Sequence, residues 1–259
     1  MSEPKRPQKS DFDAVVRLKR TNNWLLYIIF VLSVTLPFLK SQEKYQEIVL
    51  MGEIFNITLM VIFAAITFIV DYYLFPKAER VRRSDFIDNS FGTISNVEQS
   101  EKYFSNDAIE RGIYKASANL FENCLFTCKI SKKMRFRQIM KSSIFALVII
   151  GFAVIGFRNN QLAVPILQLF LSANILGDLI KLLLFVGKNE RIFEDLLKLF
   201  GDRNFKSSPY LYLPHFLKIY SDYETNLAWA MILLDSKIYK EVNPSLSVEW
   251  EALKQKLSI

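Results

Sequence analysis

The chain has 259 residues, of which 51% are hydrophobic and 23% are charged, and its net charge is +7. The apolar content is high for a soluble protein and the charged content is too high for a chain that lies wholly in a membrane. We therefore predict membrane spans that alternate with polar cytosolic segments. Much of the positive charge flanks apolar segments, where topology accounts for it, so neither DNA nor RNA is expected as a partner.

The first predicted membrane hairpin covers residues 23–75. Residues 1–22 form a basic cytosolic segment without a small-residue cleavage site, so the first apolar segment is a retained span. That span is Trp24–Leu39, with Trp24 at the interface, and the second is Ile54–Phe75, after a short polar connection.

Residues 76–138 are predicted to form a helical cytosolic insert. Its first part, Asp85–Ser100, is expected to be a loop or a short helix, and Ser105 resembles a helix start. Cys124 and Cys128 are four residues apart, near the upper limit of Cα separation for a disulfide, so we interpret them as packing residues.

The second predicted hairpin covers residues 139–187. Its apolar segments, Ile144–Phe157 and Leu162–Val186, are separated by a four-residue turn, which requires antiparallel helices. A buried hairpin in a soluble protein is the alternative. Basic runs flank the inner ends of all the apolar segments, so the positive-inside rule places both termini and the insert in the cytosol.

Residues 188–259 are predicted to form a helical cytosolic tail that packs with the insert. The fourth apolar helix is expected to continue to Gly201, and an amphipathic helix to cover Pro214–Tyr239. Ser245 or Ser247 can cap a last helix that carries Trp250 in an apolar stripe. The fold class is thus an all-α integral membrane protein with four transmembrane helices in two hairpins plus a helical cytosolic domain.

Polar residues within the apolar segments suggest a polar seam that lines a pore after assembly, because charges in hydrocarbon usually pair or face a wet cavity. Asp178 and Lys181, three residues apart, can pair within one helix. A closed bundle with interfacial charges is the alternative. The predicted seam consists of Asp71, Asn174, Asp178 and Lys181.

Enzymatic activity is not expected. The chain has one histidine, no phosphate-binding glycine loop and no Ser–His–Asp set, so we assign no catalytic residue, no metal site and no cofactor.

The segments AERVRRSDFIDNSFG, YFSND, NLFENCLF, YSDYE and LSVEW, together with the order of spans, resemble bacterial four-span pore-forming effectors of cyclic-nucleotide-based anti-phage defence systems, the SMODS-associated type. The resemblance implies an inner-membrane protein that senses a cyclic di- or oligonucleotide, assembles as a homo-oligomer and permeabilises the membrane, causing growth arrest or cell death. It also implies a functional link to a nucleotide-synthesising enzyme. In some such systems the nucleotide instead holds the effector silent.

A cyclic nucleotide needs cations for its phosphates and flat or amide side chains for its bases. For each candidate an ordinary role, as topology anchor, core aromatic or helix cap, is the alternative. The predicted ligand-binding residues are Arg80, Arg82, Arg83, Tyr103, Arg111, Tyr114, Lys115, Asn119, Asn123, Tyr220 and Tyr223. Two other functions remain open: a constitutive small channel or transporter subunit, and a membrane scaffold that recruits a cytosolic partner.

Overall fold

The described chain is helical throughout its regular structure. The computed structural model describes residues 7–40, 43–95, 100, 104–155 and 175–259, and these contain helices and no strand. The chain divides into two compact units. The bundle unit comprises Met1–Ser10, Lys77–Arg137 and Ile180–Ile259, and the apolar unit comprises Asp11–Pro76 and Gln138–Leu179.

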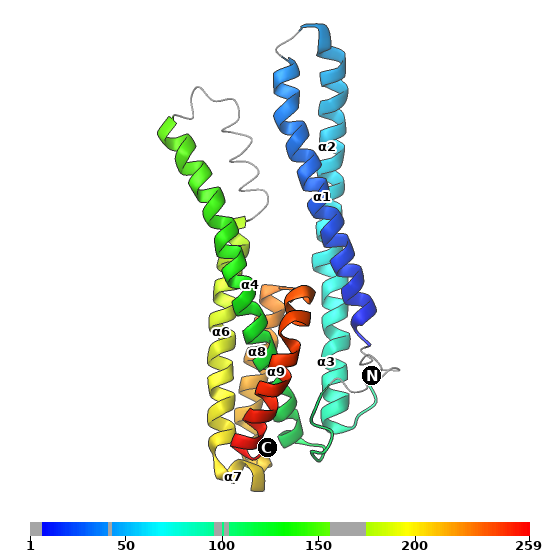
Figure 1. Cartoon of the computed structure of the whole chain (residues 1–259). Coiled ribbons are helices and arrows are strands. Elements are labelled where there is room, and N and C mark those ends of the chain that lie inside the picture. Colours follow the sequence, from blue (N-terminus) through cyan, green and yellow to red (C-terminus); the bar gives the residue numbers. More distant parts are fainter. Residues whose placement is uncertain (1–6, 41–42, 96–99, 101–103, 156–174) are drawn as a thin grey trace. The chain divides into compact units, whose positions relative to one another are not determined.

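The apolar unit contains an antiparallel helix pair, α1 (Lys9–Lys40) and α2 (Gln46–Ile69), joined through the short 3-10 helix η1 (Glu43–Tyr45) (Figure 1). Asn22 Nδ2 donates to Thr67 Oγ1 at 2.8 Å, and Asn56 Nδ2 donates to Ser33 Oγ at 3.1 Å. Gly52 allows a close approach, because a Cβ atom there would lie 2.5 Å from Leu36 Cδ2.

Both helices are long and apolar enough to cross a membrane. Only 11% of the most apolar stretch of α1 is buried, and 17% of the corresponding stretch in the helix Gln46–Phe91. The apolar side chains therefore face outward, unlike those of a soluble core helix. The turn of the second predicted hairpin lies within residues 156–174, outside the described residues.

Helix α2 widens into a π turn, η2 (Val70–Leu74), before α3 (Phe75–Phe91). The Phe75 N–H donates to the Val70 carbonyl, five residues back. Pro76 follows, has no N–H and would clash with the carbonyl four residues earlier, so a wider turn accommodates its ring.

Helix α3 corrects the expectation of a loop or short helix after Asp85. It continues to Phe91 and ends at Gly92, whose φ of 76° is left-handed. Asp85 and Asp88 on its last turns accept backbone N–H groups from the segment that follows, which ties that segment to the helix.

The next helix, α4 (Ile113–Ile155), begins later than predicted. Ser105 and Asn106 do not cap it, because their side chains donate to Glu122 instead. Helix α6 (Ile175–Gly201) ends where the sequence predicts, at Gly201, and is followed by α7 (Arg203–Ser207), whose N-cap is Asp202.

The predicted helix Pro214–Tyr239 is wrong in extent. After the 3-10 helix η4 (Pro209–Tyr212), α8 (Leu213–Ala230) ends because Met231 adopts a left-handed φ of 50°. Helix α9 (Ser236–Leu257) then starts at an Asp235 cap, and Ser245 and Ser247 lie inside it, bonded to their own helix.

The core of the bundle unit lies between α3, α4, α6, α8 and α9 and is rich in aromatic rings. Phe121 stacks on Phe200 at 5.4 Å and meets the edge of Trp250 at 5.6 Å. Cys124 and Cys128 are free and buried, as predicted for packing residues. Residues of α4 thus pack with residues of α6, α8 and α9 within this unit.

Candidate functional site

Two groups of predicted ligand residues are brought together in the bundle unit, and the first joins α3 to α8. Arg82 donates to Glu79 Oε2 from Nε at 3.0 Å and from Nη2 at 2.9 Å, and it also donates to Glu224 on α8. Arg83 Nε lies 3.9 Å from the same Glu224 carboxylate. We call Glu79, Arg82, Arg83 and Glu224 the arginine–glutamate cluster.

Burial sets the electrostatics of this cluster. Burial raises the pKa of Glu224, although Arg82 acts in the opposite direction. The neighbouring carboxylates Glu79 and Glu224 outweigh burial at Arg82 and raise the pKa of its guanidinium. Arg82 is 14% exposed in its side chain, whereas Arg83 is 45% exposed and can reach a ligand in solvent.

The two predicted tyrosines of α8 flank the cluster in different ways. Tyr220 is half-buried and stacks on Phe86 at 5.3 Å, and burial raises its pKa to about 12. Tyr223 is only 3% exposed and its hydroxyl lies 3.1 Å from Thr127 Oγ1, so it belongs to the core. Of the pair, only Tyr220 retains a partly accessible ring.

The second group lies where α3 ends and α4 begins. A cavity of about 160 Å³ is lined by Asp85, Asp88, Asn89, Ser100, Asp107, Arg111 and Lys115. Burial raises the pKa of Asp85. Lys115 is 6% exposed, and Arg111 packs over Gly92, where any Cβ would lie 2.6 Å from its guanidinium.

This aspartate pocket is small and mostly acidic. Ligand pockets for drug-sized molecules commonly occupy about 300–1,000 Å³, and the two cations here face three aspartates. In this conformation the pocket therefore does not offer a cyclic dinucleotide the space or the positive charge that two phosphates require.

Asn119, which the sequence predicts to read a base edge, lies in a buried polar network. Its side chain is fully buried, donates to Asn89 Oδ1 at 2.9 Å and accepts from Asn106 Nδ2 at 3.0 Å. Asn106 also donates to Glu122 at 2.8 Å. These amides therefore connect α3 and α4 with the loop that precedes α4.

Glu122 is the centre of that network, and the sequence analysis missed it. Ser105 donates to its carboxylate from both N and Oγ, and Trp250 Nε1 on α9 donates to the same Ser105 Oγ at 2.9 Å. Burial raises the pKa of Glu122 to about 7. The only signal in the sequence is a single acidic residue within an apolar helical pattern.

The remaining ligand candidates are dispersed. Arg80 is exposed on α3, Asn123 is half-buried on α4, and Tyr114 packs against Phe200 and Phe205. Tyr103 lies outside the described residues.

Three residues of the predicted polar seam, Asp71, Asp178 and Lys181, lie in the described part of the chain. Asp71 is half-buried in the π turn, while Asp178 and Lys181 are exposed on α6. Lys181 makes no ion pair within the described residues. Asn174 lies outside the described residues.

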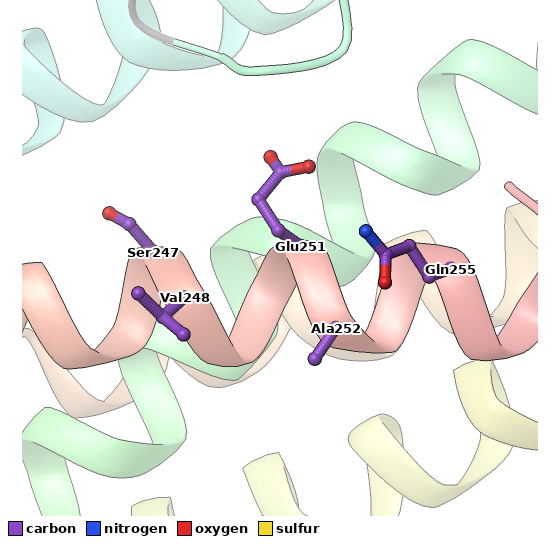
Figure 2. Close-up of a pocket in the computed structure, with 5 residues that line it drawn as sticks. All are labelled: Ser247, Val248, Glu251, Ala252 and Gln255. Carbon is purple, nitrogen blue, oxygen red and sulfur yellow. The ribbon is translucent and has the colours of Figure 1, made fainter.

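A further depression lies on the surface of α9. Figure 2 shows that Ser247, Val248, Glu251, Ala252 and Gln255, all from this one helix, line it, and its volume is about 370 Å³. No second element contributes a lining side chain, so the depression has no converging groups to orient a ligand.

Four cations of the basic run of α4 are paired with acids within the bundle unit. Lys129, Lys133 and Arg137, spaced one helical turn apart, pair with Glu249, Glu241 and Asp235, and Lys132 pairs with Glu190 of α6 at 2.8 Å. These cations were interpreted from the sequence as topology anchors, and the structure gives them partners on α9 and α6.

No family model matches this chain, and comparisons with curated proteins and with solved structures found no match.

Proposed function

We propose that the chain is a multi-pass protein of the bacterial inner membrane in which the bundle unit senses a cyclic nucleotide and the spans then permeabilise the membrane. The observation that carries the membrane part is the inside-out helix pair α1–α2. Its apolar side chains are exposed, and its buried Asn22 and Asn56 bond to hydroxyls of the opposite helix. Lipid-facing helices associate through such polar bonds and close small-residue contacts.

In this proposal both termini and the bundle unit lie in the cytosol. Where α1 meets α2, Lys40 of α1 forms an ion pair with Glu53 of α2 at 3.1 Å, so these two charges offset one another. The opposite ends of the pair are basic, with Lys9 in α1 and Lys77 and Arg80 in α3. The positive-inside rule favours that orientation.

The arginine–glutamate cluster is the proposed point of nucleotide entry. A phosphate accepts bidentate hydrogen bonds from guanidinium groups, as a carboxylate does, and therefore competes with Glu224 for Arg82 and Arg83. Displacement of Glu224 removes the ion pairs that join α8 to α3. Because α3 follows α2 with only the π turn between them, a shift of α3 acts on α2 directly.

Expression in bacteria with and without a panel of cyclic-nucleotide synthases tests the proposal. We expect a voltage-sensitive dye to report loss of membrane potential in one of the two states. Arg83→Gln, at an exposed position, should abolish the difference, whereas Arg137→Gln, equally exposed but paired with α9, should not. An intact potential with every nucleotide and without any contradicts the proposal.

A membrane scaffold is the second candidate function. It is favoured because the polar side chains of the candidate site already bond to one another and leave little space for a ligand. Arg82 is already neutralised by two carboxylates, and the cavity beside Lys115 is smaller than a cyclic dinucleotide requires. Substitution of Asp71, Asp178 and Lys181 distinguishes the candidates, because conduction through a pore, constitutive or gated, changes while recruitment by a scaffold does not.

A further inference from the structure

Helix α6 carries cations that the bundle unit leaves without acidic partners. Lys181, Lys188 and Arg191 are exposed, and their spacing of seven and three residues places them on one face of the helix. None of the three makes an ion pair within the described residues. Of the nearby acids, Glu190 and Asp195 are engaged by Lys132 and Lys198, and the exposed Glu194 makes no ion pair with Arg191. We call these three cations the α6 stripe.

An exposed tryptophan adjoins the α6 stripe. Trp229 is the penultimate residue of α8, and 44% of it is exposed although the next residue, Ala230, is buried. Lys188 Nζ lies 4.8 Å from the centre of its ring. Leu184, between Lys181 and Lys188, is 49% exposed. A tryptophan, an exposed leucine and long cationic side chains form the combination typical of a membrane–water interface.

The stripe and Trp229 lie at the end of the bundle unit from which the chain continues into the second predicted hairpin. Leu182, Phe185 and Val186 of α6 pack with Ala230 and with Met134, which lies three residues before α4 leaves the unit at Arg137. Helix α6 enters the unit at Ile180. Arg137 and Ile180, where the chain leaves and re-enters the bundle unit, are therefore within a few residues of Met134 and Lys181 in the sequence.

We propose that Lys181, Lys188, Arg191 and Trp229 form a surface that binds the headgroups of anionic lipids at the cytosolic face of the bilayer. The inference rests on the proposed membrane insertion and adds a specific lipid contact to it. The charge distribution favours α6 for this role, because Lys129, Lys132, Lys133 and Arg137 of α4 are already paired, while the three cations of the α6 stripe are available to phosphates. Each lysine or arginine near an anionic surface contributes about fivefold to binding.

Tryptophan fluorescence of the full chain in nanodiscs tests this surface. The probe is phosphatidylglycerol brominated in the upper part of its acyl chains, compared with equally brominated phosphatidylcholine. In Trp24→Phe the emission comes from Trp229 and from Trp250, and Trp250 is 1% exposed in the bundle core, where lipid bromine cannot reach it. In Trp24→Phe we expect strong quenching, which is lost in Trp24→Phe/Trp229→Phe. The quenching should be greater with brominated phosphatidylglycerol than with brominated phosphatidylcholine.

A matched pair of triple variants tests the charges. Lys181→Gln/Lys188→Gln/Arg191→Gln should lower the preference for phosphatidylglycerol at Trp229 by tenfold or more. Lys129→Gln/Lys133→Gln/Arg137→Gln removes the same net charge from cations of α4 that are paired with Glu249, Glu241 and Asp235 rather than with α6, and should leave the preference unchanged.

Quenching of Trp24 distinguishes a failure of the proposed lipid surface from a failure of the proposed membrane insertion. In Trp229→Phe, quenching of Trp24 in α1 reports insertion of the span itself. If Trp24 is quenched and Trp229 is not, or if both triple variants behave alike, the lipid surface is overturned while membrane insertion stands. If Trp24 is also unquenched, the proposed function fails with it.

Discussion

The α1–α2 pair and the bundle unit distribute their side chains in opposite ways. Met51 and Phe68 of α2 are 74% and 63% exposed, whereas Phe121 and Trp250 of the bundle are 0% and 1% exposed. Polar contacts differ in exposure as well: the Asn56–Ser33 bond lies inside the helix pair, whereas ion pairs such as Lys133–Glu241 lie on the outside of the bundle. The exposed surface of the bundle is therefore suited to water, whereas the helices of the pair are long and apolar enough to cross a membrane.

The sharpest test of this contrast removes one aromatic side chain from each region. Trp250→Ala should lower the free energy of unfolding of the bundle by about 4 kcal/mol, because it leaves a cavity against Phe121 and removes the bond to Ser105. Phe68→Ala on the exposed face of α2 should change it little. Chemical denaturation in a mild detergent, followed by circular dichroism, measures both; equal losses would contradict the assignment of inside and outside.

Arg82 tests whether the bundle tolerates a buried charge without its partner. Arg82→Ala leaves Glu79 and Glu224 facing each other in a poorly solvated site and should cost about 3 kcal/mol of unfolding free energy. Arg83→Ala, at a 45% exposed side chain, is the control and should cost less than about 1 kcal/mol. A ranking in the reverse order would show that Arg83 holds the cluster.

Glu122 makes the stability of the bundle depend on pH. Its pKa is about 7 in the folded chain and 4.5 without the fold, so the folded state binds the proton more tightly. Its contribution to the free energy of unfolding is fully present below about pH 4.5. That contribution falls by at most about 3 kcal/mol as the pH rises to about 7 and is constant at higher pH.

The difference in unfolding free energy between wild type and Glu122→Gln, measured from pH 4 to pH 8, isolates that contribution. The variant should lack the decline. Glu241→Gln is the control of opposite sign, since Lys133 lowers the pKa of this exposed carboxylate. A flat difference for Glu122 across the range would contradict its assignment as a buried proton-binding group.

The polar contacts inside the α1–α2 pair should have a smaller effect. Asn56→Ala removes the bond to Ser33 and should destabilise the pair by about 1 kcal/mol, because interhelical hydrogen bonds in membranes contribute modestly. Thr58→Ala is the control, since its hydroxyl bonds only to its own helix at Ile54. Unfolding of the full chain in bicelles, monitored by a donor–acceptor pair on α1 and α2, gives the two values; a larger loss for Thr58 would refute the contact.

The smallest effect is expected at the ion pairs between α4 and α9. Lys133→Ala removes the contact with Glu241, but both side chains are about half-exposed, so the loss should stay below about 1 kcal/mol and shrink in high salt. Thermal melts at low and high ionic strength measure this dependence. A large loss independent of salt would place the pair in the bundle core instead.

The sequence by itself determined the helical class, the end of α6 at Gly201 and the packing role of Cys124 and Cys128. These follow from local properties: apolar spacing, a helix-ending glycine and the geometry of residues four apart. It also indicated that Trp24–Leu39 and Ile54–Phe75 are apolar enough for a membrane, and the helices that contain them pass that test in the structure.

Only the tertiary structure decided which polar residues are available to a ligand. Local spacing treats Asn119, Tyr223 and Arg82 as free groups, but tertiary contacts bury Asn119 and Tyr223 and bind Arg82 to Glu224. The same applies to helix boundaries: Ser105 is bonded to Glu122 and Trp250, so it cannot cap α4, and Asp235 rather than Ser245 starts α9. Two basic segments that look equivalent in sequence differ for the same physical reason, since the acids of α9 fold onto α4 and leave the cations of α6 exposed.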